Sequence, residues 1–124
     1  MTDDNPCYLY CAGLYEGEGT IHFNFTGKSR ALSLAIHMTD REPLDLFEDI
    51  MQVGTVYGPY AREMSKNKAR KPSYMYRVSN YDEVKSVIDR MYDWLSPRRK
   101  RQADEALTEY LKYGPPRTYK KRGG

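Results

Sequence analysis

The sequence is poor in the residues that build disulfide-linked proteins and metal clusters. Its 124 residues include only two cysteines and two histidines. Cys7 and Cys11 lie four apart, a spacing that on one helix does not allow good disulfide geometry. Two thiols are also too few for a structural zinc site, which needs four ligands. We therefore expect both cysteines to be buried thiols, and His22 and His37 to be polar surface groups rather than metal ligands.

The sequence also lacks a long apolar run. No stretch approaches the roughly 20 residues that cross a bilayer, and residues 1–11 lack the charged-then-apolar order of a secretory signal. With 40% hydrophobic and 13% aromatic residues, the chain has room for one compact domain. These features predict an intracellular protein, in the cytoplasm or an organelle matrix, with no membrane partner.

The net charge is small, but the charged residues are unevenly placed along the chain. The net charge is +3. Residues 1–60 hold three basic and nine acidic side chains, whereas residues 61–79 hold six and one, and residues 98–124 hold nine and three. Two basic blocks in an acidic chain suggest a polyanionic partner. A solvated surface followed by a basic, disordered tail over residues 114–124 is the alternative that charge alone leaves open.

The sequence predicts four strands and four helices. Apolar and polar residues alternate in four segments, which favours half-buried strands over Thr20–Thr26, Leu32–Thr39, Thr55–Tyr60 and Tyr74–Ser79. Apolar residues recur at helical spacing in three others, namely Asp40–Val53, Asp82–Leu95 and Ala103–Leu111, and a further helix is expected over Tyr8–Glu16. The order is helix, hairpin, helix, hairpin, helix, helix. It predicts an α+β fold whose antiparallel sheet packs helices on one face only.

The other face of that sheet is expected to be polar. It would present hydrogen-bonding side chains, namely His22, Asn24, Thr26, Ser33, His37, Thr39, Met75 and Arg77. Such side chains can meet base edges in a DNA groove while neighbouring cations meet phosphates. A merely solvated sheet face is the competing interpretation.

Residues 11–19 read Cys-Ala-Gly-Leu-Tyr-Glu-Gly-Glu-Gly. Gly13 and Gly17 share one face of a helix, where each glycine costs about 1 kcal/mol relative to alanine, so the pair indicates close approach of a second helix. Glu16 and Glu18 lie near the helix C-terminus, where the helix dipole disfavours anions. A carboxylate beside a free carbonyl of the last turn suits Mg²⁺.

This stretch resembles the signature of the LAGLIDADG homing endonucleases, with the alanine, the leucine and all three glycines in place. The order of elements is similar to the αββαββα core of that family, so the resemblance covers about residues 8–111. It implies a four-stranded saddle-like sheet with a further C-terminal helix, in one domain over residues 1–113. Glu18 stands where the family usually has aspartate, one methylene shorter.

The resemblance implies a site-specific endonuclease that hydrolyses a long pseudo-palindromic DNA duplex with Mg²⁺ or another divalent cation and acts on no small-molecule substrate. Because the sequence holds one motif copy, a homodimer is expected. Glu18 and Gly17 would bind metal, Glu18, Arg99 and Asp40 would be catalytic, and the dimer interface would include Ala12, Gly13, Glu16 and Gly17. For Asp40, an N-cap is the competing interpretation. Further DNA contacts would come from Lys28, Arg30, Arg62, Lys66, Lys68, Arg70, Lys71, Arg98, Lys100 and Arg101.

Two other function classes stay open. One is a non-cleaving relative, either an RNA-binding intron maturase or a DNA-binding regulator. The other is a dimeric structural protein without affinity for nucleic acid.

Overall fold

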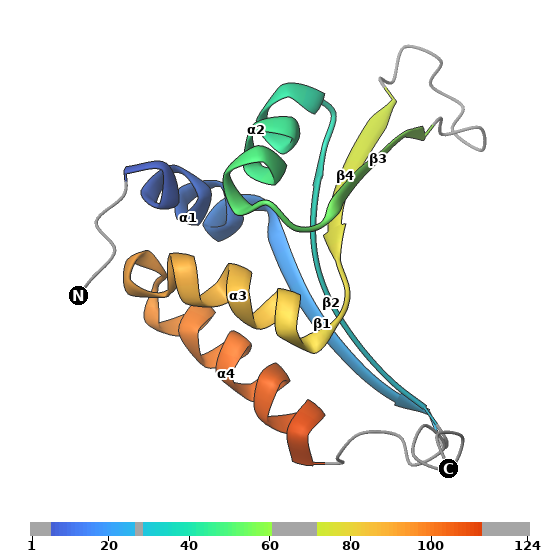
Figure 1. Ribbon diagram of the computed structural model, residues 1–124, viewed down its shortest axis with the longest axis vertical. Coiled ribbons are helices and arrows are strands. Elements are labelled where there is room, and N and C mark those ends of the chain that lie inside the picture. The colour runs from blue at the N-terminus through green and yellow to red at the C-terminus, as the bar shows by residue number, and fades with distance from the viewer. Residues whose placement is uncertain (1–5, 27–28, 61–71, 113–124) are drawn as a thin grey trace.

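The computed structural model describes residues 6–26, 29–60 and 72–112, whose helices and strands form two layers (Figure 1). Its elements follow the predicted order, with one short 3-10 helix added between the last two helices. They are α1 (Pro6–Glu18), β1 (Gly19–Thr26), β2 (Ser29–Met38), α2 (Arg41–Met51), β3 (Thr55–Tyr60), β4 (Ser73–Val78), α3 (Tyr81–Met91), η1 (Tyr92–Trp94) and α4 (Pro97–Lys112).

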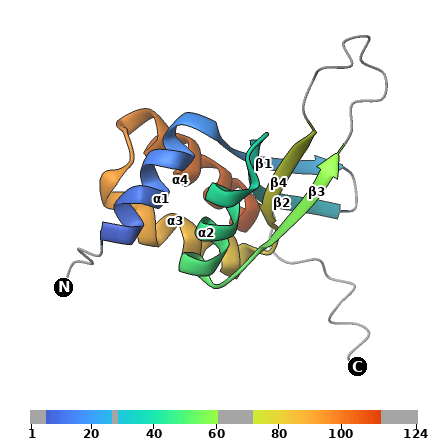
Figure 2. The same cartoon turned by 90° about the horizontal axis from the view of Figure 1, so that it is seen from above.

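The strands form one antiparallel sheet in the order β1-β2-β4-β3. All four helices cover the same face of this sheet, and the strands curve away from them at their ends (Figure 1). The view from above separates the helical layer from the strands in the same way (Figure 2). The α+β class and the one-sided packing of helices are therefore confirmed. Within residues 6–26, 29–60 and 72–112, no helix lies on the opposite face of the sheet.

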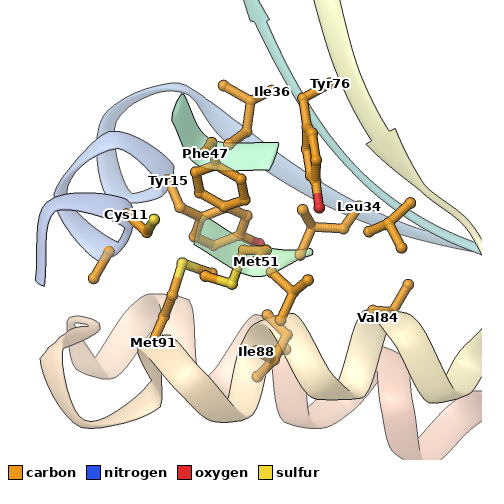
Figure 3. Close-up of a cluster of buried hydrophobic side chains, with 14 of the residues drawn as sticks. Cys11, Tyr15, Leu34, Ile36, Phe47, Met51, Tyr76, Val84, Ile88 and Met91 are labelled. Carbon is orange, nitrogen blue, oxygen red and sulfur yellow. The ribbon is translucent and has the colours of Figure 1, made fainter. Parts of the chain in front are cut away.

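The core lies between the sheet and the helices (Figure 3). Side chains from α1, α2, α3 and two strands meet there, and they include Cys11, Tyr15, Leu34, Ile36, Phe47, Met51, Tyr76, Val84, Ile88 and Met91. The Phe47 and Tyr76 rings lie 4.7 Å apart, and the Tyr76 hydroxyl donates to the Val53 carbonyl. Burying apolar area in one cluster is what fixes α1 against the sheet.

The two cysteines differ in their surroundings. Cys11 is buried in the core, and burial raises the pKa of its thiol to about 12. Cys7 is exposed, because the helix begins at Pro6 and its first turn extends beyond the core. The expectation of two buried thiols is therefore wrong for Cys7.

The last helix begins earlier than the sequence indicated. Residues 98–101 were expected before this helix, but they form its first turns. The Ser96 hydroxyl accepts a hydrogen bond from the Arg99 backbone N–H, and Pro97 takes the first helical position. Serine before proline is a strong helix start, although the same pair also suits the end of a preceding helix.

Candidate nucleic-acid interface and active site

The helix-free face of the sheet is built from aligned rows of side chains. Residues that pair directly across antiparallel strands point to the same face. His22 pairs with Ser33 in one row. Two longer rows cross three or four strands, and they consist of Thr20, Ala35, Arg77 and Thr55, and of His37, Met75 and Tyr57. The predicted polar face is thus a continuous surface.

Among the described strand residues of this face, charge has one sign. Arg77 lies exposed near its centre, between Ala35 and Thr55. No aspartate or glutamate occupies the described free-face positions of the four strands. An exposed cation whose cross-strand neighbours are neutral can approach a polyanion without repulsion.

Sequence reasoning missed the contribution of β3 to this face. Thr55 and Tyr57 lie opposite Arg77 and Met75, and Tyr57 is 43% exposed. The signal was present in the alternation of these two residues with the partly buried Val56. That alternation assigns Thr55 and Tyr57 to the same side as the polar residues of β4.

Glu18 lies where the motif helix meets the helix-free face. It is the last residue of α1, it is exposed, and β1 begins at the next residue. A surface hollow of about 340 Å³ brings it together with residues of β2, β4 and the β2–α2 connection, namely His37, Met38, Thr39 and Ser73. The proposed metal ligand therefore opens onto the surface that carries the polar rows.

Asp40 follows this hollow in the chain. It occupies the N-cap position of α2 with extended backbone angles, but its side chain makes no capping hydrogen bond. The N-cap interpretation is thus correct for the backbone and wrong for the side-chain bond. The exposed Asp40 carboxylate remains a candidate for ordering water.

The oxygen atoms at the end of α1 suit a hard divalent cation. Glu18 supplies an exposed carboxylate, and carbonyls of the last helical turn, including that of Gly17, lack intrahelical partners. The described residues include no group of three or more His, Cys, Asp or Glu side chains that could hold a metal. Among the described residues that line the hollow, Glu18 is the one carboxylate, so the other ligand positions would fall to water, DNA or a second copy.

One face of α1 is left open by the protomer. A Cβ added at Gly13 or Gly17 would meet no atom of the described residues within 4 Å, and Leu9 and Tyr10 on the same side are 52% and 41% exposed. An exposed apolar helix face with glycine notches is typical of a helix-packing surface. Ala12, which was expected in the dimer interface, is only 1% exposed and packs in the core rather than on this face.

Glu16 and Arg99 lie on a different side of α1 from the hollow. The Glu16 carboxylate accepts hydrogen bonds from the Ser96 hydroxyl and backbone, and these bonds hold the pKa of its carboxyl below the ordinary value. The Arg99 side chain is buried beside it and does not line the hollow that holds Glu18. The predicted acid and cation are thus not brought together in that hollow.

The basic residues fall into three groups. Arg30 is a correction, because its guanidinium lies 4.1 Å from the centroid of the Tyr110 ring and donates to the Tyr110 carbonyl, on the helix-covered face. Arg98 and Arg101 are exposed on the first turns of α4, and Lys100 lies over the Tyr92 ring. The remaining predicted contacts lie outside the described residues, namely Lys28, Arg62, Lys66, Lys68, Arg70, Lys71 and the side chain of Thr26, as does the tail over residues 114–124.

Comparison of the chain with solved structures identifies its fold. The homing endonuclease I-CvuI, in complex with the I-CreI target in the presence of Mg with the DNA not cleaved, matches with a TM-score of 0.68 and 16% identity, over 85% of this chain and 66% of that chain. The chain has the LAGLIDADG fold. No family model matches the sequence.

Other solved structures with the LAGLIDADG fold agree. The group I intron-encoded homing endonuclease I-CeuI, complexed with DNA, matches with a TM-score of 0.65 and 13% identity, over 90% of this chain and 56% of that chain. The LAGLIDADG meganuclease I-AabMI, bound to uncleaved DNA, matches with a TM-score of 0.65 and 20% identity, over 82% and 34%. The chain therefore spans from about a third to two thirds of the length of these proteins.

In the part of the chain that the structure describes, no helix has both the length and the apolar character of a membrane span.

Proposed function

We propose that two copies of this chain bind a double-stranded DNA target and hydrolyse one phosphodiester bond in each strand. The observation that carries this proposal is the position of Glu18, at the end of the motif helix and in one hollow with His37 and Ser73 of the helix-free face. A side chain there can reach a phosphate while the neighbouring rows contact bases. The solved structures with the same fold include DNA complexes, which supports a nucleic-acid role for this face.

In the proposed reaction, Glu18 and the Gly17 carbonyl would hold a divalent cation such as Mg²⁺. The cation, when bound, would supply Lewis-acid stabilisation of the departing 3′ oxygen and a more acidic water. A water oxygen forms a bond to phosphorus and the bond to the 3′ oxygen breaks, leaving a 5′-phosphate and a 3′-hydroxyl. Within the chain, Glu18 orients the water and Asp40 can order the surrounding solvent.

A second copy is needed to supply a second carboxylate. Gly13 and Gly17 leave the exposed face of α1 without side-chain bulk, so two such helices can approach closely. Their pairing would place two Glu18 side chains near each other and present the sheet face twice. A symmetric pair of this kind fits a pseudo-palindromic duplex.

The test is a library of duplexes incubated with the protein in Mg²⁺ or in EDTA. We expect Mg²⁺-dependent double-strand cleavage, at least about 100-fold slower with Glu18→Gln because a catalytic electrostatic contact is removed. Glu105→Gln removes an exposed carboxylate from α4 and is the matched control. Cleavage that survives Glu18→Gln unchanged contradicts the assigned ligand.

The alternatives give different results in the same experiment. A specific complex that never nicks the duplex would favour the non-cleaving relative. If the protein binds the DNA phosphates, its affinity for the duplex should fall steeply as the salt concentration rises. If the protein does not bind the duplex, or if its affinity for the duplex does not change with salt concentration, the result would favour the dimeric structural protein instead.

A further inference from the structure

Arg99 joins the end of α1 to the start of α4. Its side chain is 8% exposed. One terminal nitrogen, Nη2, donates to the Glu16 carbonyl at 3.0 Å, and the other, Nη1, donates to Oε1 of Gln102 at 3.1 Å. The guanidinium carbon lies 5.0 Å from the centroid of the Tyr15 ring. Both ends of the guanidinium fork are therefore committed to protein acceptors.

A second set of bonds crosses the same junction, again with Glu16 as the acceptor. The Glu16 carboxylate accepts from the Ser96 backbone N–H at 3.0 Å and from the Ser96 hydroxyl at 2.7 Å. The Ser96 hydroxyl in turn accepts from the Arg99 N–H at 3.2 Å. The last turn of α1 is thus bonded to α4 through its main chain and through a side chain.

These contacts limit what Arg99 can do at a phosphate. To reach DNA, the guanidinium would have to leave the Glu16 carbonyl and Gln102, and those part-buried acceptors would lose their donor. Its position at the C-terminal end of α1 also suits a cation, because the free carbonyls there carry partial negative charge. Glu18 lies two residues beyond the carbonyl that Arg99 holds.

We propose that Arg99 is a positioning residue, which fixes the last turn of α1 and thereby the direction in which Glu18 and the Gly17 carbonyl project, and that it does not touch the DNA. This role rests on the proposed function of Glu18. It differs from the active-site cation that the family resemblance implies for Arg99. Charge alone is not sufficient for this role, because the two acceptors require the planar fork of arginine.

The decisive variants are Arg99→Lys, which keeps the charge but not the fork, and Arg99→Met. Amide hydrogen exchange is measured at Gly17 and Glu18 in the full chain without metal or DNA. We expect both variants to speed exchange there by about tenfold, the factor that loss of one typical hydrogen bond gives. Arg101→Met removes an exposed charge from the same helix and should leave exchange in α1 at the wild-type rate.

Cleavage as a function of Mg²⁺ concentration gives the second readout. We expect Arg99→Lys and Arg99→Met to raise the Mg²⁺ concentration for half-maximal rate, with most of the maximal rate recovered at saturating metal. If Arg99→Lys instead keeps wild-type exchange and Mg²⁺ dependence while Arg99→Met loses maximal rate, the charge acts on the phosphate and the proposal is overturned.

The two readouts separate this proposal from the proposed function. Exchange reports on α1 even if the wild-type protein cuts no duplex, in which case the nuclease proposal fails and the role of Arg99 in fixing the turn is still decided. If Arg99→Met does not fold, Gln102→Ala removes only the acceptor of Nη1. It should speed exchange at Glu18 in the same direction by a smaller factor, and an unchanged rate would count against the proposal.

Discussion

Gly19 lies where α1 gives way to β1, packed against the ring of Tyr15. A Cβ added there would lie 2.1 Å from a ring carbon of Tyr15, which is itself fully buried. We expect Gly19→Ala to lower the free energy of unfolding by about 1–3 kcal/mol through overpacking, as measured by urea denaturation. The cost should shrink when Tyr15→Leu is combined with it, and an equal cost in both backgrounds would show that the ring is not the cause.

Arg77 is the residue of the helix-free face for which the nuclease proposal makes the most specific prediction. Its guanidinium can form a bidentate contact with a base edge, worth about 1–3 kcal/mol of discrimination. We expect Arg77→Ala to relax base preference at one symmetric pair of target positions, as measured by binding to a duplex library. A uniform loss of affinity across all sequences would instead make Arg77 a phosphate contact.

At the scale of elements, Arg30 fastens the C-terminal turn of α4 to β2. Its cation–π contact and its 2.7 Å bond to the Tyr110 carbonyl link residues 80 apart, and the Tyr110 ring also stacks on Tyr81 at 5.3 Å. We expect Arg30→Ala to lower the free energy of unfolding by about 1–2 kcal/mol. The measurement is thermal or urea unfolding, paired with DNA affinity at fixed salt, which should not change.

A matched control for this prediction is Arg41→Ala. Arg41 forms an exposed pair with Asp45 one turn away on α2, and such pairs contribute less than about 1 kcal/mol. If Arg30→Ala leaves stability at the level of this control and weakens DNA binding instead, the original assignment of Arg30 to the DNA surface is correct.

Most elements were predictable because their apolar periodicity is local and pronounced, as in α2 and α3, whereas α1 has little such periodicity and was predicted with its motif. The start of α4 was not predictable, because Ser96 and Pro97 can end one helix or begin the next. The hydrogen bond that the Arg99 backbone N–H donates to the Ser96 hydroxyl shows that they begin α4. Arg30 and the buried Leu32 are two residues apart on one strand, so strand alternation places Arg30 on the helix-covered face. Its charge suggested a phosphate contact instead. The burial of Arg99 could not be predicted, because its acceptor at Glu16 comes from a helix 83 residues away.

At the scale of the whole molecule, the open face of α1 predicts a dimer of the 14.5 kDa chain. No atom in the described part of the chain lies within 4 Å of a Cβ added at Gly13, so Gly13→Leu leaves the described protomer contacts intact but fills the notch that a second helix would use. We expect the variant to shift the mass by sedimentation from twice the chain mass to the mass of one chain. Circular dichroism should show unchanged helix content, because leucine favours helix more than glycine does.

The control places the same new side chain elsewhere. Thr108→Leu adds a leucine to an exposed position of α4. It should leave the mass unaltered, whereas a Gly13→Leu protein that still sediments as two chains would place the contact between copies on another surface.

The direct passage from Glu18 to Gly19 has one more consequence. No linker separates the acid proposed to act on the backbone from the strand proposed to recognise bases, so the two move as one stiff unit. Exchanging His22 or Asn24 would then change which duplex is chosen without changing how many base pairs separate the recognised position from the broken bond. Protein engineering could therefore change the recognised sequence, while the number of base pairs between that sequence and the cleaved bond stays constant.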